Sequence, residues 1–290
     1  MTSKICVVGS SNIDQIAYVK STPSDGETVF GSEYKMGFGG KGANQAVMSG
    51  LMGAETYMIT CLGDDVYADM TIENYKKNGV NVDHIQRVSG SSGVAPIWVD
   101  NSGQNRIIVV SGANDLINGD TAVKDIKKIN NLNVVIGQFE IPLEVTEKVF
   151  EFAKSNNITT ILNPAPAKIP SKNLLDITDW FIPNEVEFET ISGLSAFEDN
   201  NLIDFSKTIK SNLIVTLGEQ GVAYIENGLV KKISAPNVKA IDTTGAGDAF
   251  VGAFSYAIAS DFTTEESIKL GIERASDSVT KPGTQSSYSR

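Results

Sequence analysis

Short apolar runs rich in β-branched residues recur along the chain and are separated by amphipathic segments. Such runs are typical of strands buried on both faces of a parallel sheet. Residues 143–155 and 201–211, which lie between such runs, have apolar side chains at helical spacing. A strand followed by a helix, repeated, predicts an α/β fold whose helices cover both faces of a mainly parallel sheet. The predicted strands are residues 5–9, 56–62, 134–138, 159–163, 180–183 and 213–217.

Two stretches, at about residues 14–38 and 94–111, break this alternation. They contain extended runs with no helix between them, such as QIAYV and RIIVV. Because a few isolated strands cannot bury a core of their own, we expect antiparallel strands that form a small sheet over the main domain or pair with a second subunit. No repeat or long linker divides the sequence, so we predict a single α/β domain over residues 1–290 with these strands inserted as a lid.

The composition is that of an ordinary globular protein, with 290 residues, of which 41% are hydrophobic and 20% charged. The formal net charge of −11 opposes binding to nucleic acid and to anionic membranes. An anionic ligand would therefore need oriented N–H groups, a local positive charge or a metal ion. Cys6 and Cys61 lie in apolar runs and are expected to be reduced core residues. No signal-peptide pattern and no apolar run of about 18 residues is present, so we expect a cytoplasmic protein.

The segment DTTGAGDAF, residues 242–250, places small residues directly before an apolar helical pattern. The N–H groups in the first turn of a helix lack internal partners, so those of Gly245, Ala246 and Gly247 could surround an anion. Asp248 would repel that anion, but it could serve as a base that accepts a hydroxyl proton during phosphoryl transfer. The alternative is a glycine turn in which Asp248 merely stabilises the helix dipole.

The segment GFGGKGANQA, residues 37–46, leads into a second helical pattern. Its spacing formally matches a dinucleotide-binding fingerprint, but it does not follow the first strand of a βαβ unit. It also lacks the spacing and the Lys-Ser/Thr pair of a phosphate-binding loop. What remains is a close backbone approach to a small polar ligand, with Lys41 and Asn44 as hydrogen-bonding groups.

Together these motifs resemble those of the ribokinase-like carbohydrate kinases, the phosphofructokinase-B type, and the resemblance runs nearly from end to end. The matching segments, in family order, are GSSNID at 9–14, GGKGAN at 39–44, QFE at 138–140, NPAPA at 163–167, PNEVE at 183–187, TLGEQG at 216–221 and DTTGAGD at 242–248. The resemblance implies a three-layer α/β/α fold with a small β-sheet lid, and an ATP-dependent sugar kinase. It favours the terminal hydroxymethyl group of D-ribose as the phosphorylated group. Fructose, another ketose or a nucleoside are the alternative substrates, and a non-catalytic sugar-binding regulator is the alternative outside the enzymes.

The resemblance also implies roles for single residues, with Asp248 as the base beside an anion hole of Gly245, Ala246 and Gly247. The sugar-binding residues would be Asn12, Asp14, Gly40, Lys41, Asn44, Glu140 and Asp248. The nucleotide-binding residues would be Asn184, Thr216, Gly218, Glu219, Gly221 and Gly247. Structural alternatives exist: Asn12 and Asp14 suit a turn, Glu140 suits the start of a helix, and residues 216–221 suit a hairpin.

Two ions and a homodimer are implied as well. Glu187, with Asn184, resembles an element that organises Mg²⁺ through water, although the acids at 185, 187 and 189 could simply form the first turn of a helix. A monovalent cation, normally K⁺, would be bound near the anion hole, largely by main-chain oxygens. The residues at the matching positions are Asp242, Thr244, Ser278, Lys281, Gly283 and Ser287. Exposed edges of the lid strands favour pairing with a second copy of the chain.

Two features lie outside this pattern. His84, the single histidine, follows a predicted helix and is expected at the surface, which argues against histidine-based catalysis or a His-rich metal site. Residues 271–280 carry Glu273, Arg274 and Asp277 where relatives have small residues, and relatives generally continue beyond the position of Arg290 into another helix. We therefore expect the adenine-binding edge to differ from that of the relatives.

Overall fold

Buried strands alternate with helices along the chain, as the hydrophobic pattern predicts. The computed structural model describes residues 2–102 and 104–290. Each predicted strand is present with ends that shift by no more than two residues, and the run at 56–62 is divided between β4 and β5 (Cys61–Leu62). The strands of the central sheet are β1 (Lys4–Val8), β4 (Glu55–Ile59), β6 (Val80–Asn81), β10 (Val134–Gly137), β11 (Thr159–Leu162), β12 (Trp180–Phe181), β13 (Asn212–Thr216), β14 (Val222–Glu226) and β15 (Leu229–Ile233).

Within the described residues, nine strands form the central sheet in the order β15-β14-β13-β12-β11-β10-β1-β4-β6. Neighbouring strands from β13 to β6 run parallel, whereas β13, β14 and β15 are joined in antiparallel pairs. The carboxyl ends of the parallel strands therefore meet at one edge of the sheet. Open α/β sheets bind their ligands at that edge.

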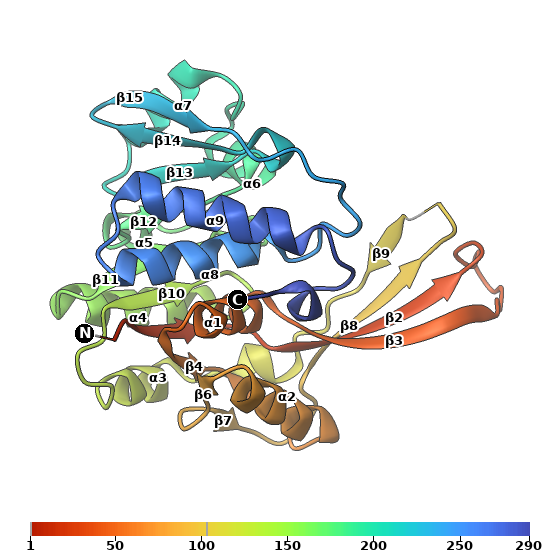
Figure 1. Cartoon of the computed structure of the whole chain (residues 1–290). Helices are drawn as coiled ribbons and strands as arrows, with labels where there is room; N and C mark the ends of the chain where they lie inside the picture. Colours follow the sequence, from red (N-terminus) through yellow and green to blue (C-terminus); the bar gives the residue numbers. More distant parts are fainter. Residues whose placement is uncertain (1, 103) are drawn as a thin grey trace.

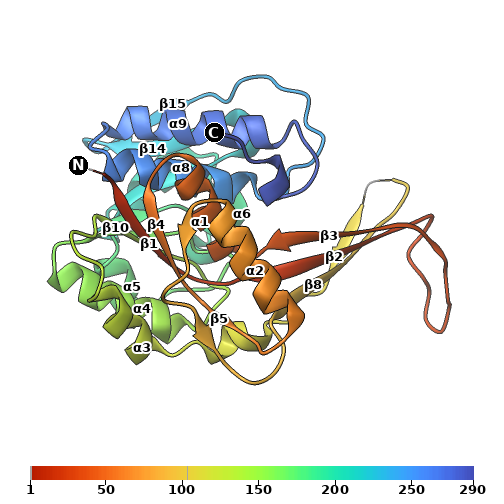
Figure 2. The ribbon, with the colours of Figure 1, turned by 60° about the horizontal axis from the view of Figure 1, so that its bottom comes forward.

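Helices cover both faces of this sheet (Figures 1 and 2). One layer holds α1 (Lys41–Leu51), α2 (Val66–Lys77), α8 (Ala246–Ala259) and α9 (Thr264–Ser278), and the other holds α3 (Gly119–Ile126), α4 (Leu143–Ser155), α5 (Lys172–Asp176), α6 (Glu185–Ser192) and α7 (Asp199–Ser206). Successive side chains of β1 alternate between the two layers: Ile5 and Val7 join the first hydrophobic core, and Cys6 and Val8 join the second. The predicted three-layer α/β/α fold is confirmed.

A small sheet, the lid, projects from the body beside α1 and α2 (Figures 1 and 2). In the described part of the chain it has four strands in the order β3 (Gly31–Gly39), β2 (Asn12–Val19), β8 (Gly93–Val99) and β9 (Asn105–Ile107). Strands β2 and β3, and likewise β8 and β9, are antiparallel, whereas β2 and β8 run parallel. The expected antiparallel arrangement therefore holds for two of the three pairs.

The remaining elements are short: β5 pairs with β7 (Gln86–Arg87), and single turns form η1 (Gly112–Leu116), η2 (Gly218–Gln220) and η3 (Gln285–Ser287). Cys6 and Cys61 are free and buried, as expected. The prediction that His84 lies at the surface is wrong. Its side chain is 11% exposed, because the ring lies against Tyr57 and its Nδ1 is 3.6 Å from Oδ1 of Asp125. No helix in the described ranges is both long and apolar enough to cross a membrane.

Candidate active site

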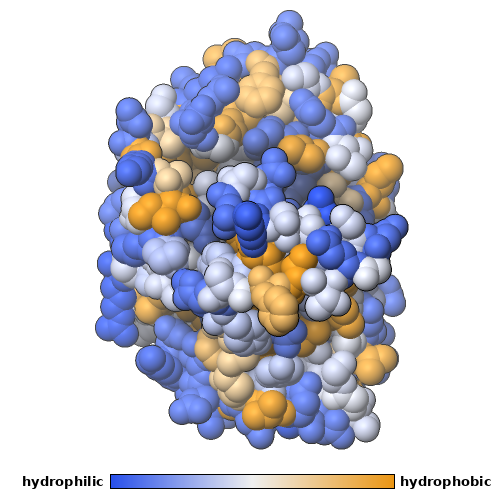
Figure 3. Space-filling model, turned by 90° about the vertical axis from the view of Figure 1, so that its right-hand side faces the viewer, coloured by the Kyte–Doolittle hydropathy of each residue, from blue (hydrophilic) through white to orange (hydrophobic). Residues whose placement is uncertain are grey.

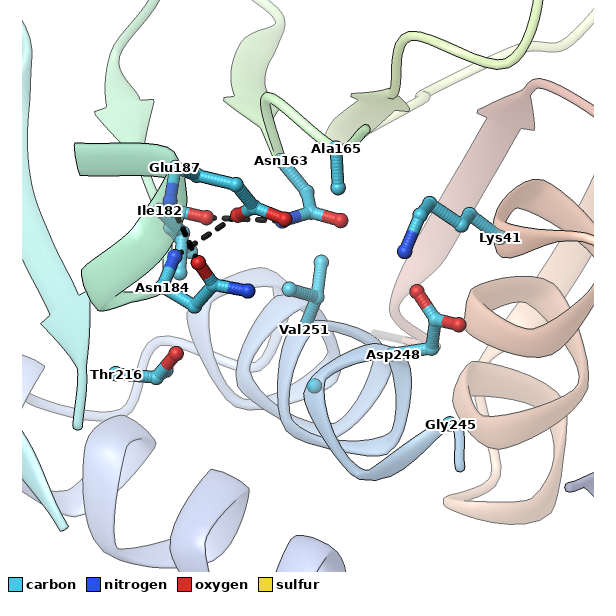
Figure 4. Close-up of a pocket in the computed structure, with 11 residues that line it drawn as sticks. Lys41, Asn163, Ala165, Ile182, Asn184, Glu187, Thr216, Gly245, Asp248 and Val251 are labelled. Atoms are coloured by element: carbon cyan, nitrogen blue, oxygen red, sulfur yellow. Dashed lines mark hydrogen bonds between the residues drawn. The ribbon is translucent and has the colours of Figure 1, made fainter. Parts of the chain in front are cut away.

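A pocket of about 130 Å³ lies at the carboxyl edge of the central sheet, beside the N-terminus of α8 (Figure 4). Its walls include seven residues that the sequence analysis assigns to a site: Lys41, Asn184, Glu187, Thr216, Gly245, Gly247 and Asp248. The pocket is also lined by Asn163, Ala165, Ile182 and Val251, to which the sequence analysis assigns no role. Residues widely separated in the sequence thus meet at one hollow.

Asp248 lies in the first turn of α8 and is only 6% exposed. Its Oδ2 accepts a hydrogen bond from Nδ2 of Asn44 at 2.8 Å, and its Oδ1 accepts one from Nε2 of Gln45 at 2.9 Å. Burial raises the pKa of the Asp248 carboxyl, while the charge of Lys41 and the two amides oppose that rise. Asp248 is therefore a fixed hydrogen-bond acceptor at the wall of the pocket.

The start of α8 offers free N–H groups beside this carboxylate. Gly245, just before the helix, has φ 77°, and a Cβ there would lie 2.4 Å from Cγ2 of Thr284. Both the left-handed backbone and the lack of space favour glycine at this position. Among the described residues, the N–H groups of Gly247 and Asp248 make no backbone hydrogen bond. Because free N–H groups at a helix start attract negative charge, this geometry suits an anion.

Lys41, the first residue of α1, points toward the carboxylate of Asp248 from the same side of the pocket, with Asn184 and Glu187 on the other side (Figure 4). Burial alone would lower the pKa of Lys41, but the carboxylates of Asp248, Glu140 and Glu187 outweigh this effect and raise it. The side chain therefore stays an ammonium group. It supplies the local positive charge that an anionic ligand of this acidic protein would need.

Asn12 and Asp14 lie at the start of β2, where the lid leaves the body. A Cβ on Gly39, which pairs with Asn12 in β3, would lie 2.5 Å from the carboxylate oxygens of Asp14. Burial, together with the charges of Glu140 and Asp248, raises the pKa of Asp14 to about 7. The structure thus places Asp14 within electrostatic reach of both other carboxyl groups.

Asn12 and Glu140 line a second hollow of about 330 Å³ next to the lid. Oδ1 of Asn12 accepts a hydrogen bond from Nδ2 of Asn114 at 2.8 Å. Oε2 of Glu140 accepts one from the N–H of Lys41 at 2.9 Å, which links the two hollows. Gly40, which precedes α1, has φ 88°, and a Cβ there would lie 2.8 Å from the main-chain nitrogen of Asn12. Of the residues predicted to bind sugar, Lys41 and Asp248 line the first hollow and Asn12 and Glu140 line the second, whereas Asp14, Gly40 and Asn44 line neither.

Asn184 and Glu187 form a capping box at the start of α6. Oδ1 of Asn184 accepts from the N–H of Glu187 at 2.8 Å, and Oε2 of Glu187 accepts from the N–H of Asn184 at 2.9 Å. The alternative given by the sequence, in which acidic residues form the first turn of a helix, is therefore present as well. Both side chains nevertheless line the pocket, and Glu187 is only 7% exposed. Because the cap uses only Oε2 of Glu187, the other carboxylate oxygen stays free of it.

Thr216 ends β13 and pairs with Asn184 through a parallel bridge, which places both on the same wall. The residues that follow form the hairpin that the sequence allows as an alternative: the N–H of Leu217 donates to the carbonyl of Gly221 at 2.8 Å. Gly218 and Glu219 lie in η2, and Gly221 ends it with φ 95°. These three residues lie outside the lining of the pocket.

The residues predicted to bind a monovalent cation lie in two segments, just before α8 and from the end of α9 onward. They are Asp242, Thr244, Ser278, Lys281, Gly283 and Ser287. The carboxylate of Asp242 accepts from the N–H groups of Thr244 and Gly283, both at 2.9 Å, and so ties the two segments together. Burial raises the pKa of Asp242, but these hydrogen bonds outweigh it and lower the pKa. Nζ of Lys281 lies 3.5 Å from the carbonyl oxygen of Ser287.

Over residues 2–102 and 104–290, no three His, Cys, Asp or Glu side chains are grouped in the way a protein-only metal site requires. A cation near Asp242 would therefore depend mainly on main-chain oxygens. Mg²⁺ in the pocket would depend on water and on the phosphates of a ligand, which is its usual manner of binding.

Three amides that contact site residues are missed by the sequence analysis. Gln45 donates to Asp248, Gln138 donates to Gln45 at 2.7 Å, and Gln285 donates to Asn44 at 2.9 Å. Gln45 and Gln138 lie inside the quoted segments 37–46 and 138–140, so the motifs contained a signal. For Gln285 the sequence offers none.

Comparisons with known proteins identify the family of this chain. The family model described as pfkB family carbohydrate kinase matches residues 2–290. A deoxyribokinase of Salmonella typhi is 37% identical over 297 residues, which cover 98% of this chain and 95% of that protein. A ribokinase of Staphylococcus aureus is 36% identical over 294 residues, covering 99% and 97%. The structure of Arabidopsis thaliana ribokinase complexed with ribose and ATP superposes with a TM-score of 0.91 at 29% identity, covering 100% of this chain and 96% of the other. This chain therefore belongs to the pfkB family of carbohydrate kinases and is an ATP-dependent sugar kinase.

Proposed function

We propose that this sugar kinase transfers the γ-phosphoryl group of ATP to the terminal hydroxymethyl oxygen of D-ribose, giving ribose 5-phosphate. The observation that supports this most directly is the position of Asp248. Its buried carboxylate lies beside the free N–H groups of α8 and next to the ammonium group of Lys41. A hydroxyl group brought to this point would meet a base and an anion-binding site together.

In the proposed reaction Asp248 accepts the hydroxyl proton as the oxygen bonds to the γ-phosphorus. The bond from the γ-phosphorus to the bridging oxygen breaks, and ADP leaves. The N–H groups at the start of α8 and the ammonium of Lys41 stabilise the charge on the transferring group. The sugar is held by hydrogen bonds from residues at the body and at the base of the lid. These are Asn12, Asp14, Gly40, Lys41, Asn44 and Glu140. Closure of the lid would exclude water and so limit wasteful hydrolysis of ATP.

We propose that ATP lies along the carboxyl edge of the sheet, with its phosphates toward Asn184, Thr216 and Gly247. Gly218, Glu219 and Gly221 would contact the rest of the nucleotide from the hairpin beyond Thr216. The support is the shared wall of Asn184 and Thr216, which leads from the pocket toward that hairpin.

Two cations complete this proposal. The free oxygen of Glu187 fits hydrated Mg²⁺, which when bound would neutralise phosphate charge, and Asn184 lies beside it. Next to the anion hole, the single carboxylate of Asp242 and the nearby main-chain oxygens fit a monovalent ion such as K⁺. Hard oxygen donors with one formal negative charge match such an ion better than a transition metal.

2-Deoxyribose is the second candidate substrate, because the deoxyribokinase relative matches this chain as closely as the ribokinases do. The test is a panel of ribose, 2-deoxyribose, fructose and nucleosides, with ATP consumption measured and the phosphate position assigned by mass and phosphorus NMR. We expect the highest kcat/KM for ribose and a 5-phosphate product. A clear preference for a nucleoside would reject the sugar assignment. Sugar binding in calorimetry without turnover would instead favour a regulator.

We also propose a cytoplasmic homodimer that pairs through the lid. The lid exposes large apolar side chains, among them Phe30 at 94% and Tyr34 at 61%. Hydrophobic side chains lie near the centre of the face toward which the lid projects (Figure 3). An exposed apolar sheet of this kind is a typical interaction surface. Light scattering should show a dimer, and the double variant Phe30→Ser, Tyr34→Ser should be monomeric; a monomeric parent chain would refute the proposal.

A further inference from the structure

The side-chain amides around Asp248 are arranged head to tail, with each NH₂ group directed toward the carboxylate. In the first chain, Gln138 donates to Oε1 of Gln45 at 2.7 Å, and Gln45 donates to Oδ1 of Asp248 at 2.9 Å. In the second chain, Gln285 donates to Oδ1 of Asn44 at 2.9 Å, and Asn44 donates to Oδ2 of Asp248 at 2.8 Å. Each oxygen of Asp248 is thus the end point of one amide chain.

The outer amides decide which way the inner amides face. A side-chain amide has almost the same shape after a half turn that exchanges its oxygen and nitrogen. Alone, Asn44 could therefore present either a donor or an acceptor to Asp248. With the NH₂ group of Gln285 fixed on its oxygen, only the donor orientation is satisfied at both ends. Gln138 imposes the same constraint on Gln45.

The second chain is itself anchored on α2. Nδ2 of Asn74 donates to Oε1 of Gln285 at 2.7 Å, so Gln285 must keep its own NH₂ group directed toward Asn44. Hydrogen bonds aligned in one direction polarise one another, which strengthens the last bond to the carboxylate.

Gln138 is difficult to explain by stability alone. It is completely buried, and within the described residues its Oε1 has no hydrogen-bond partner. That oxygen faces Gly9, where a Cβ would lie only 2.0 Å away. A buried unpaired acceptor destabilises the folded state, so an apolar side chain would serve the core better. The group that Gln138 does satisfy is the oxygen of Gln45.

We propose that Gln45, Gln138 and Gln285 are positioning residues, which hold both oxygens of Asp248 in one orientation with the remaining lone pairs free for the sugar hydroxyl. This inference rests on the proposed role of Asp248 as the base. Hydrogen bonds from Asn44 and Gln45 also lower the pKa of Asp248 against the effect of burial. Loss of either bond should therefore move the acidic limb of the pH–rate profile to higher pH.

The other charged or titratable groups near Asp248 come from five other elements or segments and stay in place in every variant below. They are Lys41 on α1, Asp14 on β2, Glu140 after β10, Glu187 on α6 and Tyr288 after η3. A shift of the acidic limb in these variants can then be assigned to the amide chains.

The first test compares Gln45→Met with the double variant Gln45→Met, Gln138→Leu. The single variant breaks the bond to Oδ1 of Asp248, and also the 3.2 Å bond that Nε2 of Gln45 donates to Oδ1 of Asn163. It leaves the NH₂ group of Gln138 unpaired. We expect kcat to fall about 10²-fold, as a misplaced catalytic group commonly costs, with the acidic limb moved to higher pH. The double variant removes the unpaired amide, so Tm should recover while kcat and the acidic limb do not. Recovery of kcat together with Tm would mean that the amides are merely structural.

The second test is Gln285→Glu, which changes almost no volume. A carboxylate cannot donate to Oδ1 of Asn44, so Asn44 should turn its NH₂ group toward residue 285 and its oxygen toward Asp248. We expect kcat to fall, KM for the sugar to rise and the acidic limb to move to higher pH. Ser255→Ala is the matched control, because Ser255 is buried on α8 but donates only to Val251 of its own helix. Its kinetics should be unchanged.

Two outcomes separate this inference from the proposed function. Near-normal turnover of Asp248→Asn would reject the base and with it the amide chains. Loss of turnover in Asp248→Asn, with folded Gln285→Glu and double variants that keep the parent kcat and pH profile, would reject the positioning residues alone. If Gln45→Met fails to fold, the double variant and Gln285→Glu still decide the question.

Discussion

The two sides of the candidate site, body and lid, are built by opposite means. In the body, Asp248 is buried and Lys41 is half-buried, and both are held by hydrogen bonds or charges from several elements. In the lid, Tyr34 of β3 and Phe30, which directly precedes that strand, expose large side chains to solvent. In the proposed function, the chemistry is thus organised before substrate arrives, and exclusion of water is left to a part with a weakly packed surface. Substitutions in the body should therefore change kcat or KM for ATP, and those in the lid should change KM for the sugar.

The largest effect is expected for Asp248→Asn. The amide cannot accept the hydroxyl proton as a base, so kcat should fall by about 10²- to 10⁴-fold. Sugar affinity measured by calorimetry should remain close to that of the parent, because the other sugar-binding residues are unchanged. Asp261→Asn, at the exposed far end of α8, makes the same charge change and should leave turnover intact. Turnover of Asp248→Asn near the parent level would contradict the proposal that Asp248, in the body, is the base of the reaction.

A pair of glycine variants tests the anion hole. Gly245→Ala adds a Cβ where φ is 77° and Thr284 and Tyr288 are too close, so it should lower the free energy of unfolding by about 1–3 kcal/mol and reduce kcat. Gly247→Ala meets no protein atom within 4 Å, so Tm should hold while KM for ATP rises. Thermal unfolding and ATP kinetics measure both. Equal losses of Tm would show that the positive φ and the lack of space at position 245 do not make it more sensitive than position 247.

Asp14→Asn tests the carboxyl group at the junction of body and lid. In the folded protein the pKa of Asp14 is about 7, against an ordinary value of 3.8. The folded state therefore holds this proton more tightly, and stability is lost as pH rises between those values. Removing the group should raise the free energy of unfolding by an amount that grows across this window and is constant above it. Urea unfolding at several pH values measures this gain; a gain independent of pH would contradict it.

The smallest effect is expected for Tyr67→Phe. Nε2 of Gln15 in β2 donates to the hydroxyl of Tyr67 on α2 at 2.8 Å, which ties lid to body. Loss of this single, partly exposed bond should raise KM for the sugar a few-fold and leave kcat near the parent value. A fall in kcat without a change in KM would show that the lid takes part in the chemical step.

Local hydrophobic patterns predict the helices and strands of the body well, because each of these elements is determined by the residues within it. Residues 143–155 form α4 with the predicted bounds, and the buried runs become strands. The helix predicted at 201–211 is less accurate, because α7 ends at Ser206 and a turn then leads into β13. Local patterns cannot predict the parallel pairing of β2 with β8, because it joins strands about 80 residues apart in the sequence.

Features that depend on distant partners are the ones the sequence fails to predict. The sequence predicts His84 at the surface, whereas contacts with Tyr57 and Asp125 leave its side chain only 11% exposed. The motif residues at 39–44 and 242–248 do converge. Of the three glutamines around Asp248, Gln45 and Gln138 at least lie inside the quoted motifs, whereas nothing in the sequence points to Gln285. An isolated glutamine on a helix is equally compatible with solvent.

The hydrogen bonds that close the pocket join very distant parts of the chain. Asn44 and Asp248 are 204 residues apart, and Gln285 contacts Asn44 across 241 residues. No fragment or half-formed intermediate can assemble this arrangement, since such contacts form only after long loops close. During refolding, helical signal should return before any turnover does. Immature chains in a cell would accordingly consume no ATP, and recovered activity reports a fully folded molecule.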